Sequence, residues 1–145
     1  MNEFSFEELY IGQTAEFSVT IESEMPDMFR KLSGDTNPLH CNRDYAVSMG
    51  YSDRVIYGML TASFYSTLAG VYLPGKYCLL YEVNTSFNKP VFIGDTLKVR
   101  GEIKELDDKF RFALIKAVIT NQNGEKVSKA TIKAGVKSEI KPKTD

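Results

Sequence analysis

A stretch without any charged residue runs from Val55 to Gly75, with the sequence VIYGMLTASFYSTLAGVYLPG. A helix at a protein surface keeps a polar stripe, but residues 57 to about 70 carry only hydroxyls, methyl groups and rings. We therefore expect a helix here that is buried on every side. A membrane-spanning helix needs roughly 20 predominantly apolar residues, and Pro74 and the Ser and Thr residues of this stretch argue against one.

The polar and apolar positions elsewhere predict strands on both sides of this helix. From Thr14 to Ile21, apolar residues alternate with polar ones, which is the period of a half-buried strand. Four later segments have strand character and are separated by turn residues: Tyr77–Phe87, Thr96–Leu106, Phe110–Asn121 and Lys126–Lys137. A sheet wrapped around one long helix is an α+β arrangement. Such a sheet leaves an open edge, and we therefore expect a homodimer or a higher homo-oligomer.

A shorter helix is predicted between the first strand and the uncharged helix. Ser23 can cap its start, and Gly34 can end it in a left-handed turn. Residues 35 to 40 then form an irregular loop, because Pro38 pushes the residue before it out of the helical region. A short helix resumes near residues 42 to 49.

Length and composition narrow the class of protein. With 145 residues, of which 43% are hydrophobic, the chain fits a single domain over 1–145, with a flexible tail from about 139 to 145. A formal net charge of −1 gives no basic surface for nucleic acid or for an anionic membrane.

The two cysteines, Cys41 and Cys78, are too few for a disulfide framework, and the first residues do not resemble a signal peptide. We therefore expect the cytoplasm as the compartment. One histidine and two distant cysteines do not supply the ligands of a protein-bound zinc site, and no cofactor motif is present.

The densest group of reactive side chains is the loop SGDTNPLH, residues 33 to 40, which contains the only histidine of the chain. Chemistry that needs a group titrating near neutrality must use His40 or a strongly perturbed carboxylate. Asp35 lies across a turn stiffened by Pro38, so the two side chains could meet at one water as an acid/base pair. Alternatively, Asp35 caps the turn and His40 is an ordinary polar residue, and the residues alone leave both interpretations open.

The segment from Leu32 to His40 resembles the signature of the MaoC-like, (R)-specific enoyl-CoA hydratase family, in which S/G-x-D-x-N-P-L/I-H follows a hydrophobic residue. Further landmarks follow in order: Gly58–Ser63, Leu73–Gly75, Phe87–Val91 and Gly94–Asp95. The resemblance implies a hot-dog fold, in which a curled antiparallel sheet wraps a long helix, usually as a dimer. It also implies reversible addition of water to a trans-2-enoyl thioester of coenzyme A or acyl carrier protein, giving the (R)-3-hydroxyacyl product.

The same resemblance implies roles for individual residues. Asp35 and His40 match the catalytic pair, and Gly58 matches the residue whose backbone N–H binds the thioester oxygen at a helix N-terminus. Ser63 matches a hydroxyl near the pair, and Asn37 of the loop is counted with the substrate-binding residues. An N–H at this position suits the reaction, because negative charge builds on the thioester oxygen as an enolate forms.

Tyr57 departs from the family pattern, in which His or another small polar residue precedes the glycine. We count it with the substrate-binding residues, since its ring could narrow the acyl tunnel or its hydroxyl could add a donor. It could equally fill a dimer interface. Two other functions stay open: a non-catalytic module that binds acyl thioesters or assembles with other proteins, and a thioesterase on the same fold.

Overall fold

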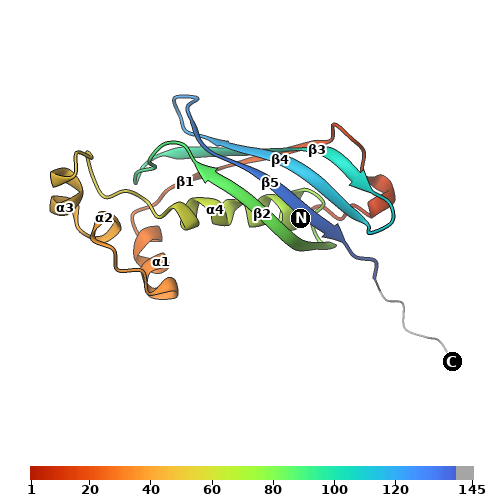
Figure 1. Ribbon diagram of the computed structural model, residues 1–145, viewed down its shortest axis with the longest axis horizontal. Helices are drawn as coiled ribbons and strands as arrows, with labels where there is room; N and C mark the ends of the chain where they lie inside the picture. Colours follow the sequence, from red (N-terminus) through yellow and green to blue (C-terminus); the bar gives the residue numbers. More distant parts are fainter. Residues whose placement is uncertain (140–145) are drawn as a thin grey trace.

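Five strands form one antiparallel sheet that curls around a central helix, as the sequence predicts (Figure 1). The structure is a computed structural model and describes residues 1–139, so the expected tail lies outside the described residues except for its first position. The sheet order is β1-β3-β4-β5-β2, which leaves β1 and β2 at the two edges. The strands are β1 Thr14–Thr20, β2 Cys78–Phe87, β3 Thr96–Asp107, β4 Phe112–Thr120 and β5 Lys126–Val136.

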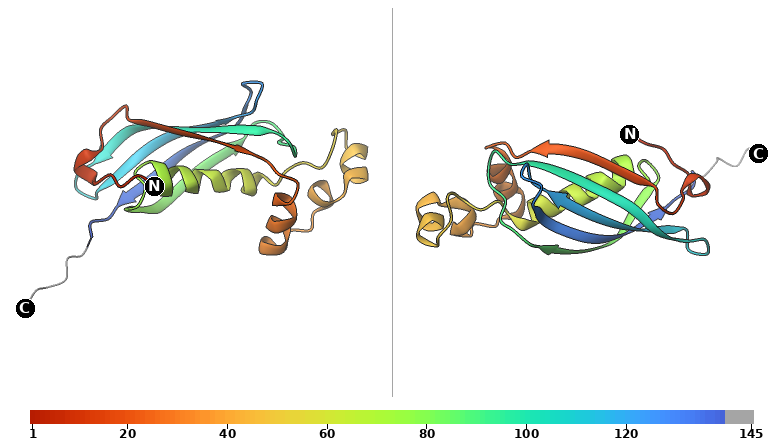
Figure 2. Two further views of the ribbon diagram at one scale, coloured as in Figure 1. Left: turned by 180° about the vertical axis from the view of Figure 1, so that it is seen from behind. Right: turned by 90° about the horizontal axis from the view of Figure 1, so that it is seen from above.

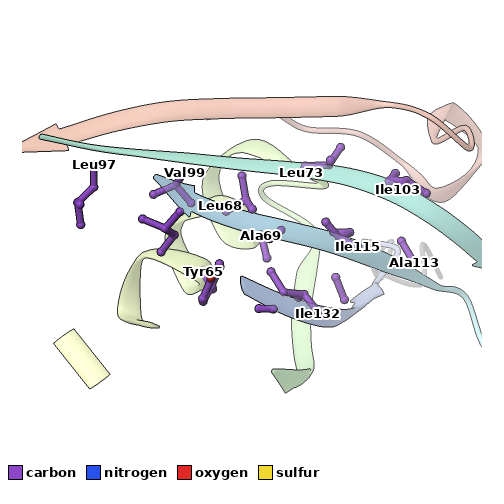
Figure 3. Close-up of a cluster of buried hydrophobic side chains, with 14 of the residues drawn as sticks. Tyr65, Leu68, Ala69, Leu73, Leu97, Val99, Ile103, Ala113, Ile115 and Ile132 are labelled. Atoms are coloured by element: carbon purple, nitrogen blue, oxygen red, sulfur yellow. The ribbon is translucent and has the colours of Figure 1, made fainter. Parts of the chain in front are cut away.

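Helix α4, Gly58–Thr67, lies along the concave face of the sheet and continues into a π-helical turn, η2, Leu68–Tyr72 (Figures 1 and 2). Alternate residues of the strands point toward it, because successive side chains of a strand face opposite sides. Figure 3 shows the resulting core, in which Tyr65 and Leu68 lie among strand residues such as Ile115 and Ile132. None of the helices in residues 1–139 has the length and apolar character that crossing a bilayer requires.

The prediction that this helix is buried on every side is wrong for a single chain. Met59, Ser63 and Ser66 are exposed, and Met59 keeps 63% of its side chain accessible. These residues are four and three positions apart, so they form one stripe along the helix. The sheet covers only the opposite side of α4. In a single chain, the uncharged stripe is therefore exposed to solvent.

The remaining helices differ from the predictions in detail. Three of them, α1 Met25–Ser33, α2 Pro38–Cys41 and α3 Arg43–Ser48, lie beyond one end of the sheet, at the left of Figure 1, and a 3₁₀ turn, η1, covers Phe6–Glu8. The N-cap of α1 is Glu24 and not Ser23, whereas Gly34 ends the helix with a φ of 73°, as expected. The predicted loop also contains α2, because Asn37 caps a helical turn whose first residue is a proline.

Gly101 in β3 sets how closely the sheet approaches the central helix. A Cβ atom at this position would lie 2.8 Å from Cδ2 of Leu68 and 2.9 Å from Cγ2 of Ile115. Real Cβ atoms essentially never approach other atoms so closely. Any larger residue here would therefore force the side chains of Leu68 and Ile115 to shift.

Gly101→Ala should destabilise the protein by about 1–3 kcal/mol, because the new methyl group overpacks the core. The free energy of unfolding, measured by urea denaturation, checks this. Gly70→Ala is the matched control, since a Cβ at Gly70 would meet nothing within 4 Å, and its effect should stay within about 1 kcal/mol. Equal stability losses in the two variants would contradict the close approach.

Candidate active site

The loop before α2 is held by hydrogen bonds from its own side chains. Oδ1 of Asp35 accepts a hydrogen bond from the backbone N–H of Asn37 at 3.0 Å, and Oδ1 of Asn37 accepts one from the N–H of Leu39, also at 3.0 Å. The backbone N–H of Asp35 donates to Oγ of Ser33 at 3.2 Å. Short polar side chains that bond to backbone two residues on stabilise turns. Asp35 and Asn37 therefore shape the loop that leads to His40.

The imidazole of His40 is fixed to the segment that leads into α4. Its Nδ1 lies 2.6 Å from the carbonyl oxygen of Val55, and the N–H of Val55 donates to the carbonyl of Leu39 at 3.1 Å. A carbonyl oxygen can only accept, so Nδ1 carries the proton. In the neutral ring, Nε2 then keeps its lone pair and can act as a base or hydrogen-bond acceptor.

Tyr57 joins the loop to the protein core. Its side chain is only 2% exposed, and its hydroxyl donates to the backbone carbonyl of Asp35 at 2.6 Å. The Tyr57 ring also packs against the His40 ring, with 4.2 Å between the ring centroids. Burial, and after it the hydrogen bond with Cys41, raises the pKa of the Tyr57 phenol well above its usual range. The phenol therefore stays protonated and remains a donor at neutral pH.

In the single chain, Tyr57 has a contact that none of the three roles considered for it includes. Its hydroxyl already serves the loop, and it is buried within a single chain without any partner subunit. It is also not among the residues that line the cavity at the N-terminus of α4. We interpret Tyr57 as the anchor of the Asp35 backbone.

A cavity of about 310 Å³ lies at the N-terminus of α4. It is lined by His40, Tyr51, Val55, Ile56, Gly58, Thr61, Phe87, Asn88, Lys89, Pro90, Val91 and Val127. Gly58 is the first residue of α4, so its N–H has no acceptor within the helix and lies at the positive end of the helix dipole. A Cβ at Gly58 would come within 3.3 Å of the Phe87 ring, so a side chain there would crowd the cavity wall.

The structure brings only some of the predicted site residues to this cavity. His40 and Gly58 line it, whereas Asp35, Asn37 and Ser63 do not, and the side chain of Asp35 is exposed in the single chain. The Ser63 hydroxyl donates to the carbonyl of Leu60 at 2.6 Å. Ser63 lines a separate, mostly apolar groove of about 430 Å³ with Met25, Met28, Phe29, Leu32, Leu60 and Phe64.

Besides Tyr51, Thr61 of α4 is a residue with a hydroxyl group that lines the cavity, and the sequence alone did not single it out. A signal for it exists in the chain, because Thr61 follows Gly58 by three residues and residues three apart share a face of a helix. Within residues 1–139, no group of three or more His, Cys, Asp and Glu side chains is arranged to hold a metal ion.

Comparison with known proteins places this architecture in a family. The MaoC like domain matches residues 7–127. This chain belongs to the MaoC-like family. An (R)-specific enoyl-CoA hydratase from Rhodospirillum rubrum is 35% identical over 115 residues, which are 79% of this chain and 80% of the relative. A 3-hydroxybutyryl-CoA dehydratase from Methylorubrum extorquens is 31% identical over 140 residues, covering 94% of this chain and 88% of the relative.

Solved structures confirm the predicted α+β hot-dog fold of this MaoC-like protein. The (R)-hydratase from Aeromonas caviae superposes with a TM-score of 0.86 at 30% identity, covering 90% of this chain and 99% of that one. The (R)-hydratase PhaJ1 from Pseudomonas aeruginosa also gives 0.86, at 27% identity, covering 99% of this chain and 97% of that one.

One charged pair lies at the cavity of this MaoC-like protein. Lys89 is among the lining residues, and its ammonium group forms an ion pair with the carboxylate of Glu125. Both side chains remain substantially accessible, so the pair contributes little to stability.

Tyr57→Phe should loosen the loop more than it destabilises the fold. Losing one hydrogen bond to the Asp35 carbonyl costs about 0.5–1.5 kcal/mol, so amide hydrogen exchange in residues 35–41 should rise roughly 2- to 10-fold. Mass spectrometry of the exchanged protein measures this. Tyr65→Phe is the matched control, because its hydroxyl bonds to Ser128 in the core and not to the loop. An equal rise in loop exchange in both variants would rule out Tyr57 as the anchor.

Proposed function

We propose that this MaoC-like protein is an (R)-specific enoyl-thioester hydratase, a hydro-lyase that adds water reversibly to a trans-2-enoyl thioester. The observation that carries the proposal is the shared cavity of His40 and Gly58 at the N-terminus of α4. It combines a base with a free lone pair and a backbone donor at the positive end of a helix. The relatives named above as hydratase and dehydratase support the same reaction in its two directions.

The backbone N–H of Gly58 binds the thioester carbonyl oxygen. When the oxygen of water bonds to C3 of the enoyl group, the π electrons move toward that carbonyl and negative charge builds on its oxygen. A fixed donor and the positive end of the helix dipole stabilise this charge in the transition state. The absence of a side chain at Gly58 leaves the thioester free to approach the backbone.

We assign the protons of the water molecule to Asp35 and His40, of which only His40 lines the cavity in a single chain. Oδ1 of Asp35 is occupied by the N–H of Asn37, while Oδ2 has no hydrogen-bond partner in residues 1–139 and can accept a proton. His40 orients the same water through Nε2, because Nδ1 is held by the carbonyl of Val55. One proton of the water leaves as the C3–O bond forms, and a proton is delivered to C2, so that the net change is the addition of H₂O.

The substrate is a thioester of coenzyme A or acyl carrier protein with an acyl chain that fits a small cavity. A volume of about 310 Å³ is at the lower end of the range for ligand sites. The ammonium group of Lys89 at the cavity wall, which pairs with Glu125 in the single chain, offers a contact for a phosphate of either carrier.

The two cysteines agree with the cytoplasm as the compartment that we propose. Both are free thiols, in α2 and β2 respectively. Burial raises the pKa of the Cys78 thiol to about 11, so it stays protonated and poorly nucleophilic at neutral pH. Free thiols of this kind persist in a reducing environment.

Asp35→Asn and His40→Ala should each lower hydration of crotonyl-CoA by about 10²- to 10⁴-fold, because each removes a group that positions or transfers a proton. The loss of absorbance at the enoyl band measures hydration. Asp44→Asn in α3 is the control for the loss of a nearby exposed carboxylate and should keep wild-type turnover. Near wild-type rates in either loop variant would show that the pair is misassigned.

The same assay separates the proposal from the two other functions. Loss of the enoyl band without free thiol indicates hydration, whereas loss with release of free coenzyme A indicates a thioesterase. An unchanged band in the wild-type protein, despite binding of the thioester, would identify a non-catalytic module.

We also propose that the functional form is a homodimer or a higher homo-oligomer. Edge strand β2 has an open side and carries several exposed apolar side chains: Leu79 49%, Leu80 38%, Tyr81 44% and Phe87 49%. The uncharged stripe of α4, with Met59, is exposed as well. Unprotected apolar edges of this kind pair with another strand, and a second copy of the chain offers a matching one. Phe87 also lines the cavity, so the partner would lie next to the site.

Leu80→Lys should shift the protein toward monomers, because a charge on an edge strand opposes pairing. Molar mass from light scattering during gel filtration checks this. Phe110→Lys is the matched control: its side chain is also exposed, at 64%, but lies outside β2. Its oligomeric state should not change. A monomeric wild-type protein, or equal masses for both variants, would contradict the proposal.

A further inference from the structure

Thr61 carries a buried hydroxyl that the mechanism above does not use. The residue is only 2% exposed, and its Oγ1 has no hydrogen-bond partner anywhere in residues 1–139. It lines the same cavity as His40 and Gly58. A buried hydroxyl without a partner is costly, so native structures normally satisfy such groups with protein, water or ligand.

The helix itself does not offer the hydroxyl an acceptor. A threonine within a helix can bond to the carbonyl four residues earlier, which is that of Tyr57. That carbonyl already accepts hydrogen bonds from the N–H groups of Leu60, at 3.1 Å, and of Thr61, at 3.2 Å. Oγ1 of Thr61 is thus left without an acceptor in residues 1–139, while the residue lines the cavity.

The position of Thr61 indicates which acceptor is within its reach. Thr61 follows Gly58 by three residues, on the same face of α4. Cα–Cβ bonds of a helix tilt toward its N-terminus, so the Thr61 side chain covers the turn that contains Gly58. A ligand oxygen that accepts from the Gly58 N–H is therefore within the region that the Thr61 hydroxyl can reach.

We propose that the Thr61 hydroxyl is a second donor to the thioester carbonyl oxygen, beside the backbone N–H of Gly58. This inference rests on the proposed function, because it assigns the thioester oxygen to the N-terminus of α4. Two donors from different directions stabilise the developing enolate more than one does. The ligand in turn supplies the acceptor that the hydroxyl lacks in the protein.

Thr61→Val and Thr61→Ser test the proposal. The valine has nearly the same shape without the hydroxyl, so kcat for crotonyl-CoA should fall about 10- to 100-fold with a smaller change in KM. The serine keeps the hydroxyl and should stay within about threefold of wild type, since the donor is retained. Thr61→Val should also have an equal or higher Tm, because it removes a buried group without a partner. A purely structural threonine would not give lower activity with undiminished stability.

Thr67→Val is the matched control, since Thr67 ends the same helix and does not line the cavity. It should leave kcat unchanged. Wild-type kcat in Thr61→Val, or an equal loss in Thr61→Ser, would overturn the inference while leaving the hydratase proposal intact.

Binding of butyryl-CoA, measured by isothermal titration calorimetry, separates this inference from the proposed reaction. The saturated thioester cannot be hydrated, and Thr61→Val should bind it at least about threefold more weakly than wild type and Thr61→Ser. If the wild-type protein binds butyryl-CoA but does not hydrate crotonyl-CoA, the reaction is refuted and the comparison of the variants still decides the role of Thr61. Equal binding by all three proteins, or none by wild type, would overturn the role.

Discussion

The packing of one uncharged helix against the concave face of the sheet determines where the N-terminus of α4 lies. Tyr65 and Leu68 are fully buried in this contact, and Gly101 allows the sheet to come close to Leu68. Full burial of a large apolar side chain stabilises a protein by about 1.5–3 kcal/mol, so these contacts outweigh any single polar interaction of the site. The core therefore positions the helix that begins with Gly58.

The loop with Asp35 and His40 has no such support of its own. It is exposed and internally hydrogen bonded, and three hydrogen bonds tie it to the segment before α4. The Tyr57 hydroxyl donates to the Asp35 carbonyl, Nδ1 of His40 donates to the Val55 carbonyl, and the Val55 N–H donates to the Leu39 carbonyl. All three involve residues shortly before the helix. A displacement of the helix N-terminus would therefore move the loop with it. The position of His40 relative to the backbone N–H of Gly58 would then be kept. The conformational entropy of these groups is therefore lost when the protein folds and not when substrate binds.

The sequence predicted the features that follow from repeating patterns of residues. It predicted much less about contacts between residues that are far apart in the chain. Alternation in the strands, the missing charges of α4 and the motif in the loop correctly gave the α+β fold and the family. Nothing in the sequence indicates that Tyr57 bonds to a carbonyl 22 residues earlier, because a tyrosine before a helix has many possible partners. The all-round burial of α4 was also wrong, since the absence of charge shows only that some apolar surface covers a helix. It does not show whether that surface belongs to the same chain.

The two hydroxyl residues Thr61 and Ser63 show how helical geometry separates two functions along α4. Each residue advances about 100° around an α-helix, so Thr61 lies about 60° from Gly58 and Ser63 about 140° away on the other side. Thr61 lines the cavity, and Ser63 lies on the stripe that the sheet leaves uncovered. In the functions proposed above, one side of the helix carries the chemistry and the other the surface for a second chain. Phe87, at the end of β2, is exposed at the open edge and forms part of the cavity wall, so the proposed assembly and the proposed reaction share a residue. If β2 pairs with a second copy as proposed, the pairing would alter the cavity wall next to Gly58.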